Sequence, residues 1–304
     1  MNIEKYETTS LWKATLAAQE KDAYAKERER LRSAYYQFRK HVAHLVADIR
    51  SNLPGLTVHD ITHLDALWGV AEQIAGPNYP LNPAEAFVLG GAFLLHDSAH
   101  AIAAFPGGKA EIKKTKRWSD LVAQNYAQKE PAPGSNEEKA ALFQVLRHLH
   151  GPQAEKLLTE SWTATGNHTP NFLLEDTALR NFYGEMIGEI AASHHRSPQE
   201  VTRKFSGPKK TAMGDLPTEW TVDRMKIAFL LRTADAAHVD DRRAPQFLFA
   251  LQKPQGISEQ HWRFQSKLGQ PTYMGNGELN ISSSRAVSAS TNAMPGGLHT
   301  TPCK

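Results

Sequence analysis

The chain of 304 residues has the composition of a soluble globular protein, with 40% hydrophobic and 22% charged residues and a formal net charge of +3. This charge neither requires nor excludes a nucleic-acid partner, so any anionic ligand must be held by a local basic patch. The single cysteine, Cys303, excludes a disulfide framework and a cysteine-based zinc site, which fits a reducing cytoplasm. No segment has the roughly 20 apolar residues of a membrane span, and no signal sequence is visible. We therefore expect a cytoplasmic protein without a membrane partner.

Apolar residues recur at helical spacing through most of the chain, in segments that Pro, Gly or a polar capping residue closes. In chain order, the predicted helices span residues 3–50, 57–75, 83–105, 137–150, 153–158, 175–193 and 223–238. No strand pattern stands before Trp262, so the body of the fold is predicted to be all-α.

From Trp262 onward the pattern becomes typical of strands. Residues 263–268 and 278–282 alternate, and Asn276-Gly277 between them is a strong signal for a tight turn, so we expect a small β-hairpin on the helical body. Residues 284–304 are polar and aperiodic, which predicts disorder. This last segment is unlike a natural domain end, which suggests a truncation or an altered reading of a longer chain.

The pair His96-Asp97 is the centre of the candidate functional site. The apolar run over residues 86–95 places both side chains at the wall of a core, where a buried charge needs a compensating partner. A divalent metal is such a partner. Other histidines and one aspartate stand at or near the ends of further apolar helical runs. The complete candidate set is His63, His96, Asp97, His150, His194, His195 and Asp235.

These seven side chains predict a site for one or two metal ions. Imidazole and carboxylate ligands suit Mn, Fe, Co, Ni or Zn better than calcium, and Mg is also possible. Seven ligands exceed the needs of one ion, whereas a carboxylate bridging two ions about 3.5–4 Å apart, as in many phosphoester hydrolases, would account for them. For each histidine taken alone, a hydrogen-bonded core residue is the competing interpretation.

The order of these residues resembles the HD-domain metal-dependent phosphohydrolase superfamily. Thr62-His63-Leu64 is similar to the first histidine motif of that superfamily, and residues 230–235 are similar to its distal aspartate helix. His150 and His194-His195 resemble the binuclear branch that includes the HD-GYP cyclic-dinucleotide phosphodiesterases. The resemblance implies one metal held by His63, His96, Asp97 and Asp235. It implies a second metal, reached by the bridging Asp97 and held by His150, His194 and His195.

The departures from the HD-GYP pattern narrow the resemblance. Arg196-Ser197-Pro198 follows where Gly-Tyr-Pro would stand, which argues against cyclic di-GMP as the substrate. His100 replaces a lysine and is similar to the catalytic histidine of the dNTP triphosphohydrolase branch. Residues 56–63, which include His59, and the hairpin also resemble HD modules of bacterial conflict systems. Such modules are often joined to an Hsp90-like ATPase, so an ATPase partner domain or protein is one expectation.

We expect four parts: an N-terminal helical extension (1–50), an HD phosphohydrolase domain (51–250), a β-hairpin appendage (251–283) and a disordered tail (284–304). The expected reaction is hydrolysis of a phosphoester or phosphoanhydride bond in a nucleotide or nucleic acid. Asp97 and His100 are the expected catalytic residues. His100 would donate a proton to the leaving oxygen, because imidazole exchanges protons near neutral pH. Basic side chains considered as phosphate contacts are Lys113, Lys114, Lys116, Arg117, Arg196 and Arg232.

Three other interpretations stay open. The chain could be a nucleotide-sensing module that signals to a partner domain without turnover. It could be a metal-dependent nuclease, which differs from the expected enzyme in substrate alone. It could also be a helical scaffold whose histidines are core residues, in which case the purified protein would carry no stoichiometric metal. The sequence leaves the substrate and the oligomeric state open.

Overall fold

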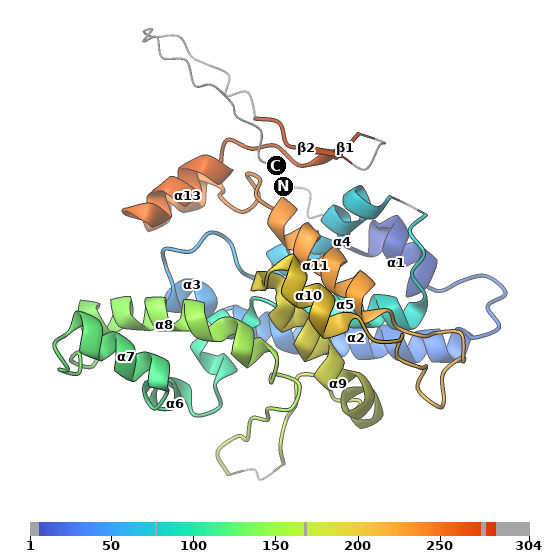
Figure 1. The fold of residues 1–304 in the computed structure, drawn as a ribbon, viewed down its shortest axis with the longest axis horizontal. Helices are drawn as coiled ribbons and strands as arrows, with labels where there is room; N and C mark the ends of the chain where they lie inside the picture. The colour runs from blue at the N-terminus through green and yellow to red at the C-terminus, as the bar shows by residue number, and fades with distance from the viewer. Residues whose placement is uncertain (1–5, 77, 167–168, 275–277, 284–304) are drawn as a thin grey trace, which may run out of the picture.

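Nearly all of the regular secondary structure is helical in the structure, a computed structural model that describes residues 6–76, 78–166, 169–274 and 278–283 (Figure 1). This confirms the all-α prediction. The α-helices are α1 (Ser10–Thr15), α2 (Ala25–Val46), α3 (Ile49–Asn52), α4 (Ile61–Ala75), α5 (Pro83–Leu95), α6 (Gly108–Lys113), α7 (Lys116–Asn125), α8 (Asn136–Ala154), α9 (Thr177–Ala192), α10 (Pro198–Phe205), α11 (Arg224–Ala237), α12 (Gln246–Gln252) and α13 (Ile257–Gln265). The 3-10 helices are η1 (Tyr6–Thr8), η2 (Ser98–His100), η3 (Ile102–Ala104) and η4 (Ser193–His195).

Helix α5 is the central element of the fold, and all 13 of its residues are buried. Asn82 and Glu85 form a capping box that fixes its N-terminus. Two adjacent glycines let neighbouring helices approach closely. A Cβ at Gly90 would lie 2.6 Å from Tyr35 of α2, and one at Gly91 would lie 3.0 Å from Ile187 of α9. The close packing of α5 explains why the run that ends at Leu95 has no polar face.

The ends of several helices meet beside the C-terminus of α5. His96 directly follows α5, and His194 lies in η4, directly after α9. His150 and Asp235 lie close to the ends of α8 and α11, whereas His63 is in the first turn of α4. The fold therefore brings side chains from five helical elements to one place in the core.

The N-terminal segment is not the single helix predicted over residues 3–50. Residues 16–24 separate α1 from α2. Within this link Lys21 has a left-handed backbone, with φ of 55°. The Asp22 carboxylate accepts the backbone N–H of Tyr24 at 3.0 Å, a local bond that competes with helix formation. A helix-rich composition therefore did not show the break.

The predicted break at Gly151-Pro152 is also wrong, because α8 continues to Ala154 and no helix spans residues 153–158. Pro152 lies in the last turn of α8, where it removes one backbone hydrogen bond without ending the helix. None of the helices in the described ranges is long and apolar enough to cross a membrane.

The C-terminal hairpin is present, but its first strand is not where the alternation predicted it. β1 (Thr272–Tyr273) pairs antiparallel with β2 (Leu279–Asn280). Residues 263–265 instead finish α13, in which Trp262 is buried and Arg263 pairs with Glu259 one turn earlier at 2.7 Å. A stretch this short does not distinguish a period of two from one of 3.6.

The expected Asn276-Gly277 turn and the tail over residues 284–304 lie outside the described residues. Figure 1 shows α13 and the hairpin at one edge of the helical body, opposite α9.

Candidate metal centre

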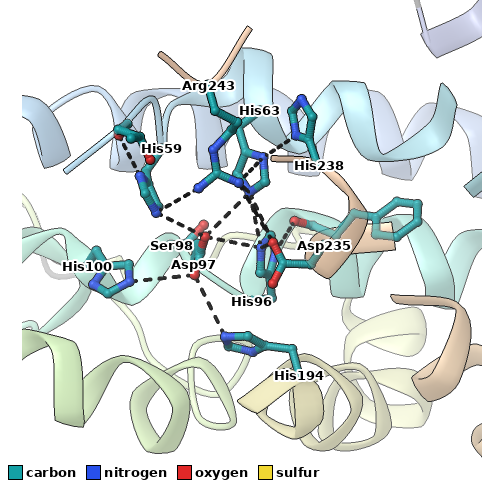
Figure 2. Close-up of polar contacts among 12 residues, drawn as sticks. His59, His63, His96, Asp97, Ser98, His100, His194, Asp235, His238 and Arg243 are labelled. Atoms are coloured by element: carbon teal, nitrogen blue, oxygen red, sulfur yellow. Dashed lines mark hydrogen bonds and ion pairs between the residues drawn. The ribbon is translucent and has the colours of Figure 1, made fainter. Parts of the chain in front are cut away.

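Four donor atoms converge in the core, and we call this group site A: His63, His96, Asp97 and Asp235 (Figure 2). His96 Nε2 lies 3.2 Å from Asp97 Oδ2 and 3.5 Å from Asp235 Oδ1. His63 Nε2 lies 3.4 Å and 3.7 Å from the same two oxygens. Ligands bound about 2.0–2.2 Å from a common ion lie roughly 3–3.5 Å apart. The donors of site A therefore fit a single divalent ion with little rearrangement.

A second group, which we call site B, consists of His150, His194 and His195, whose donor atoms lie within 4.8 Å of one another. His150 Nε2 and His194 Nε2 are 3.2 Å apart. Asp97 connects the two sites, because its Oδ2 faces site A while its Oδ1 lies 3.8 Å from His194 Nε2. This is the placement that a carboxylate bridging two ions requires.

Three of the imidazoles are held in the tautomer that a metal needs. In His96, His150 and His194, Nδ1 lies 2.7–3.0 Å from the carbonyl oxygen of the residue three positions earlier. A carbonyl only accepts, so Nδ1 carries a proton, and in the neutral ring Nε2 presents its lone pair. The same orientation of metal-binding histidines by a second acceptor recurs in metalloproteins. The donor set therefore fits a transition-metal site in its chemistry as well as its spacing.

The charges of site A form an ion pair before a metal binds. Burial lowers the pKa of His96, but the carboxylates of Asp97 and Asp235 outweigh burial and raise that pKa to about 10. Burial likewise raises the pKa of both carboxyl groups, but His96 outweighs it and their pKa values fall below the usual range. A metal at site A would therefore replace a proton on His96.

The histidines of site B are neutral at physiological pH. Burial lowers the pKa of His150 to about 3 and that of His194 to about 4. Partial burial of the ring and the neighbouring Arg196 also lower the pKa of His195, although the residue as a whole is the most exposed of the three. Their lone pairs are therefore available without the loss of a proton.

His100 and His59 flank the bridging carboxylate. His100 Nε2 lies 3.6 Å from Asp97 Oδ1, and the His100 ring stacks on His150 with centroids 4.2 Å apart. His59 Nε2 lies 3.7 Å from Asp97 Oδ2. The donors of His59, Asp97 and His100 also lie within 4.8 Å of one another, so the geometry permits a metal role for His100 as well as a catalytic one.

Two buried residues at the site were missed from the sequence. His238 Nδ1 lies 2.8 Å from His63 Nδ1. Arg243 Nη2 donates to His59 Nε2 at 2.9 Å, and burial lowers the pKa of this guanidinium. His238 could have been found from its spacing, since it follows Asp235 by about one helical turn. Nothing in the sequence distinguishes Arg243 from the neighbouring charged residues.

The basic side chains after α5 lie on the surface. Lys113 and Lys116 pair with carboxylates at 2.6 and 2.7 Å, whereas Lys114 and Arg117 are exposed. Their role as phosphate contacts stays a prediction.

The two arginines are closer to the metal ligands. Arg232 Nη1 donates to the carbonyl oxygen of His194 at 2.8 Å, so it holds the segment that carries site B. Arg196 Nη2 lies 3.2 Å from Glu155 Oε2. The structure thus brings the predicted metal ligands together, and it places Arg232 and Arg196 beside them.

Comparison with known families identifies the family of the chain. The HD-CE family model matches residues 53–295, well over half of the chain. This range contains both candidate metal sites together with His59, His100, His238 and Arg243. No curated protein and no solved structure matches the chain.

Proposed function

Because the chain belongs to the HD-CE family, we propose that it is a metal-dependent phosphohydrolase that cleaves a phosphoester or phosphoanhydride bond in a nucleotide or nucleic acid. The observation that carries this proposal is the position of Asp97. Its two carboxylate oxygens face two different sets of imidazoles. A pair of ions joined by one carboxylate is a recurrent arrangement in enzymes that hydrolyse phosphoesters.

The chain's own residues supply the ligands and the surroundings. When bound, divalent cations lower the pKa of water and neutralise the charge that develops on phosphoryl oxygens. The mixture of imidazole and carboxylate favours Mn, Fe, Co, Ni or Zn. Site A would hold one ion through His63, His96, Asp97 and Asp235. Site B would hold the other through His150, His194, His195 and the second oxygen of Asp97.

His100 is the proposed proton donor to the leaving oxygen. Its Nε2 faces the bridging carboxylate at 3.6 Å, and stacking on His150 fixes the plane of its ring. Its Nδ1 is buried and has no hydrogen-bond partner within the described part of the chain.

A groove of about 770 Å³ between α3, α8 and α13 supports a nucleotide as the substrate. Lys109, Lys139 and Lys253 line it together with Phe143, and no carboxylate occurs among its described lining residues. Phe143 precedes His150 by seven residues on α8, so the groove begins about 10 Å from site B. Lysines suit phosphates, and an aromatic ring can stack on a base.

The test is an activity screen of the purified protein with added Mn²⁺, over dNTPs, cyclic mono- and dinucleotides and single-stranded DNA. We expect hydrolysis of at least one class, lost with a chelator and reduced at least about 100-fold in Asp97→Asn, which keeps the shape of the side chain. Stoichiometric metal without hydrolysis of any substrate would instead support a nucleotide-sensing module. Absence of bound metal would support a scaffold.

A further inference from the structure

We propose that His238 is a positioning residue for site A. It accepts a hydrogen bond from Nδ1 of His63 and thereby selects the tautomer of His63 whose Nε2 can bind a metal. The inference rests on the metal site of the proposed function, but it does not depend on the reaction that the metal supports.

The two rings meet edge to edge. Their planes differ by 16°, their centroids are 5.0 Å apart, and Nδ1 of His63 lies 2.8 Å from Nδ1 of His238 (Figure 2). When two imidazole rings lie in one plane and meet nitrogen to nitrogen, the distance between their centroids equals the N···N distance plus the radius of each ring. The observed centroid distance fits this arrangement. The contact is therefore a head-on hydrogen bond, in which one nitrogen donates and the other accepts.

His63 needs this partner because its local backbone offers none. In His96, His150 and His194, Nδ1 is directed to the carbonyl oxygen of the residue three positions earlier. For His63 that oxygen belongs to Asp60, where it already accepts the backbone N–H groups of His63 at 3.0 Å and Leu64 at 3.4 Å. Both lone pairs of the Asp60 carbonyl are thus used. The side chain of His238, directly after α11, takes the role that the backbone plays elsewhere.

Arg243 does not compete for this hydrogen bond. Its Nη1 lies 3.0 Å from Nδ1 and 3.1 Å from Nε2 of His63. An atom nearly equidistant from both ring nitrogens must lie over the ring face, since within the plane it would clash with Cε1. The edge of His63 at Nδ1 is therefore left to His238.

His238 is buried, and its side chain makes few other polar contacts in the described part of the chain. The residue is 2% exposed, and its Nε2 has no hydrogen-bond partner among the described residues. The contact with His63 is thus the hydrogen bond that its ring makes within the described structure. With His63 donating, Nδ1 of His238 is the acceptor and its proton is on Nε2.

Three substitutions separate acceptor geometry from packing. In His238→Asn, the amide oxygen can take the place of Nδ1. In His238→Gln, the longer side chain places its amide where Nε2 was, so it does not replace the acceptor. His238→Phe keeps an aromatic ring but has no acceptor. We expect Zn²⁺ affinity at site A, measured by competition with a chelator, to fall about 10- to 100-fold in the Gln and Phe variants, and by less than about threefold in Asn. His41→Phe, which removes an imidazole bonded to the carbonyl of Phe172, is the matched control.

A second measurement does not depend on the variants folding. Long-range proton–nitrogen spectra of the Zn²⁺-loaded protein should show a proton on Nδ1 of His63 and on Nε2 of His238. Equal affinity in the Asn and Phe variants, or a proton on Nδ1 of His238, would overturn the proposal. Metal binding with these signatures but without hydrolysis would contradict only the proposed function. A wild-type protein that binds neither Zn²⁺ nor Mn²⁺ would overturn both.

Discussion

At the scale of single residues, the two metal sites should respond differently to pH. The pKa of His96 is raised to about 10, so this ring must lose a proton before a metal can bind at site A. Affinity at site A should therefore rise about tenfold per pH unit between pH 7 and 9. Site B should show no such dependence over this range, because the pKa values of His150 and His194 are about 3 and 4.

Calorimetric titration with Zn²⁺ in two buffers of different ionisation enthalpy measures these protons directly. We expect about one proton released per ion at site A and none at site B. His194→Ala isolates site A and serves as the control. If that variant released no proton at pH 7, the ion pair of His96 with Asp97 and Asp235 would not persist in solution.

His100 can be tested apart from metal binding. If it protonates the leaving oxygen, His100→Ala should lower turnover roughly 10²–10⁴-fold while metal content stays unchanged. The loss should shrink for a nitrophenyl phosphodiester, whose leaving group hardly needs a proton. Equal losses on both substrates would indicate a positioning role. A parallel loss of metal would place His100 with His59 and Asp97 as a ligand group, which their spacing also permits.

At the scale of elements, the approach of α9 to the end of α8 depends on Gly188. A Cβ at this position would overlap the carbonyl oxygen of Glu155. This oxygen belongs to the backbone, so it cannot move away as the end of a flexible side chain could. Gly188→Ala should therefore push α9 away from α8 and weaken metal binding at site B. It should also lower the free energy of unfolding of the metal-free protein by about 1–3 kcal/mol. The measurements are thermal unfolding with chelator present and Zn²⁺ stoichiometry.

Gly184 provides the matched control on the same face of α9, one turn earlier. Its added Cβ would meet Leu158 at 3.4 Å, an ordinary contact. Gly184→Ala should be neutral or stabilise by up to about 1 kcal/mol, because alanine is the better helix former. Similar destabilisation by both substitutions would contradict a specific close approach at Gly188.

The sequence predicted the helices well where periodicity is long, and less well where structure depends on one local bond. The buried run of α5 and the order of the metal motifs were sufficient to locate the His96-Asp97 pair. The bond to Asp22 within the link before α2, and the burial of Trp262 in α13, are contacts that periodicity does not encode.

The same limit applies to the site. The spacing of its ligands follows local helical geometry, so candidate ligands could be named from the sequence. The contact of His238 with His63 joins α11 to α4 across 175 residues. Only the tertiary structure reveals such a pair.

At the scale of the whole molecule, the groove and the metal sites should contribute separately to substrate use. Lys139→Glu should raise KM for a nucleotide substrate about 3- to 10-fold with little change in kcat, because the lysine lies in the groove and not at the ions. A small nitrophenyl phosphodiester, which cannot reach the groove from the metal sites, should be used equally well. Lys40→Glu, an exposed lysine of α2, controls for net charge. An effect on both substrates, or from both substitutions, would assign the lysine a general electrostatic role.

The meeting of helix ends beside α5 has a consequence for the order of binding. Four helices, α5, α8, α9 and α11, direct their C-terminal turns toward the ligands, and among the ligand-bearing helices α4 alone presents its N-terminus. Each C-terminus carries a partial charge of about −0.5 from its aligned peptide dipoles. The backbone therefore makes the site attractive to cations and repellent to phosphates, even before the carboxylates are counted. Under the proposed function, we therefore expect cations to bind first and reverse this field, and a phosphate substrate to bind after them.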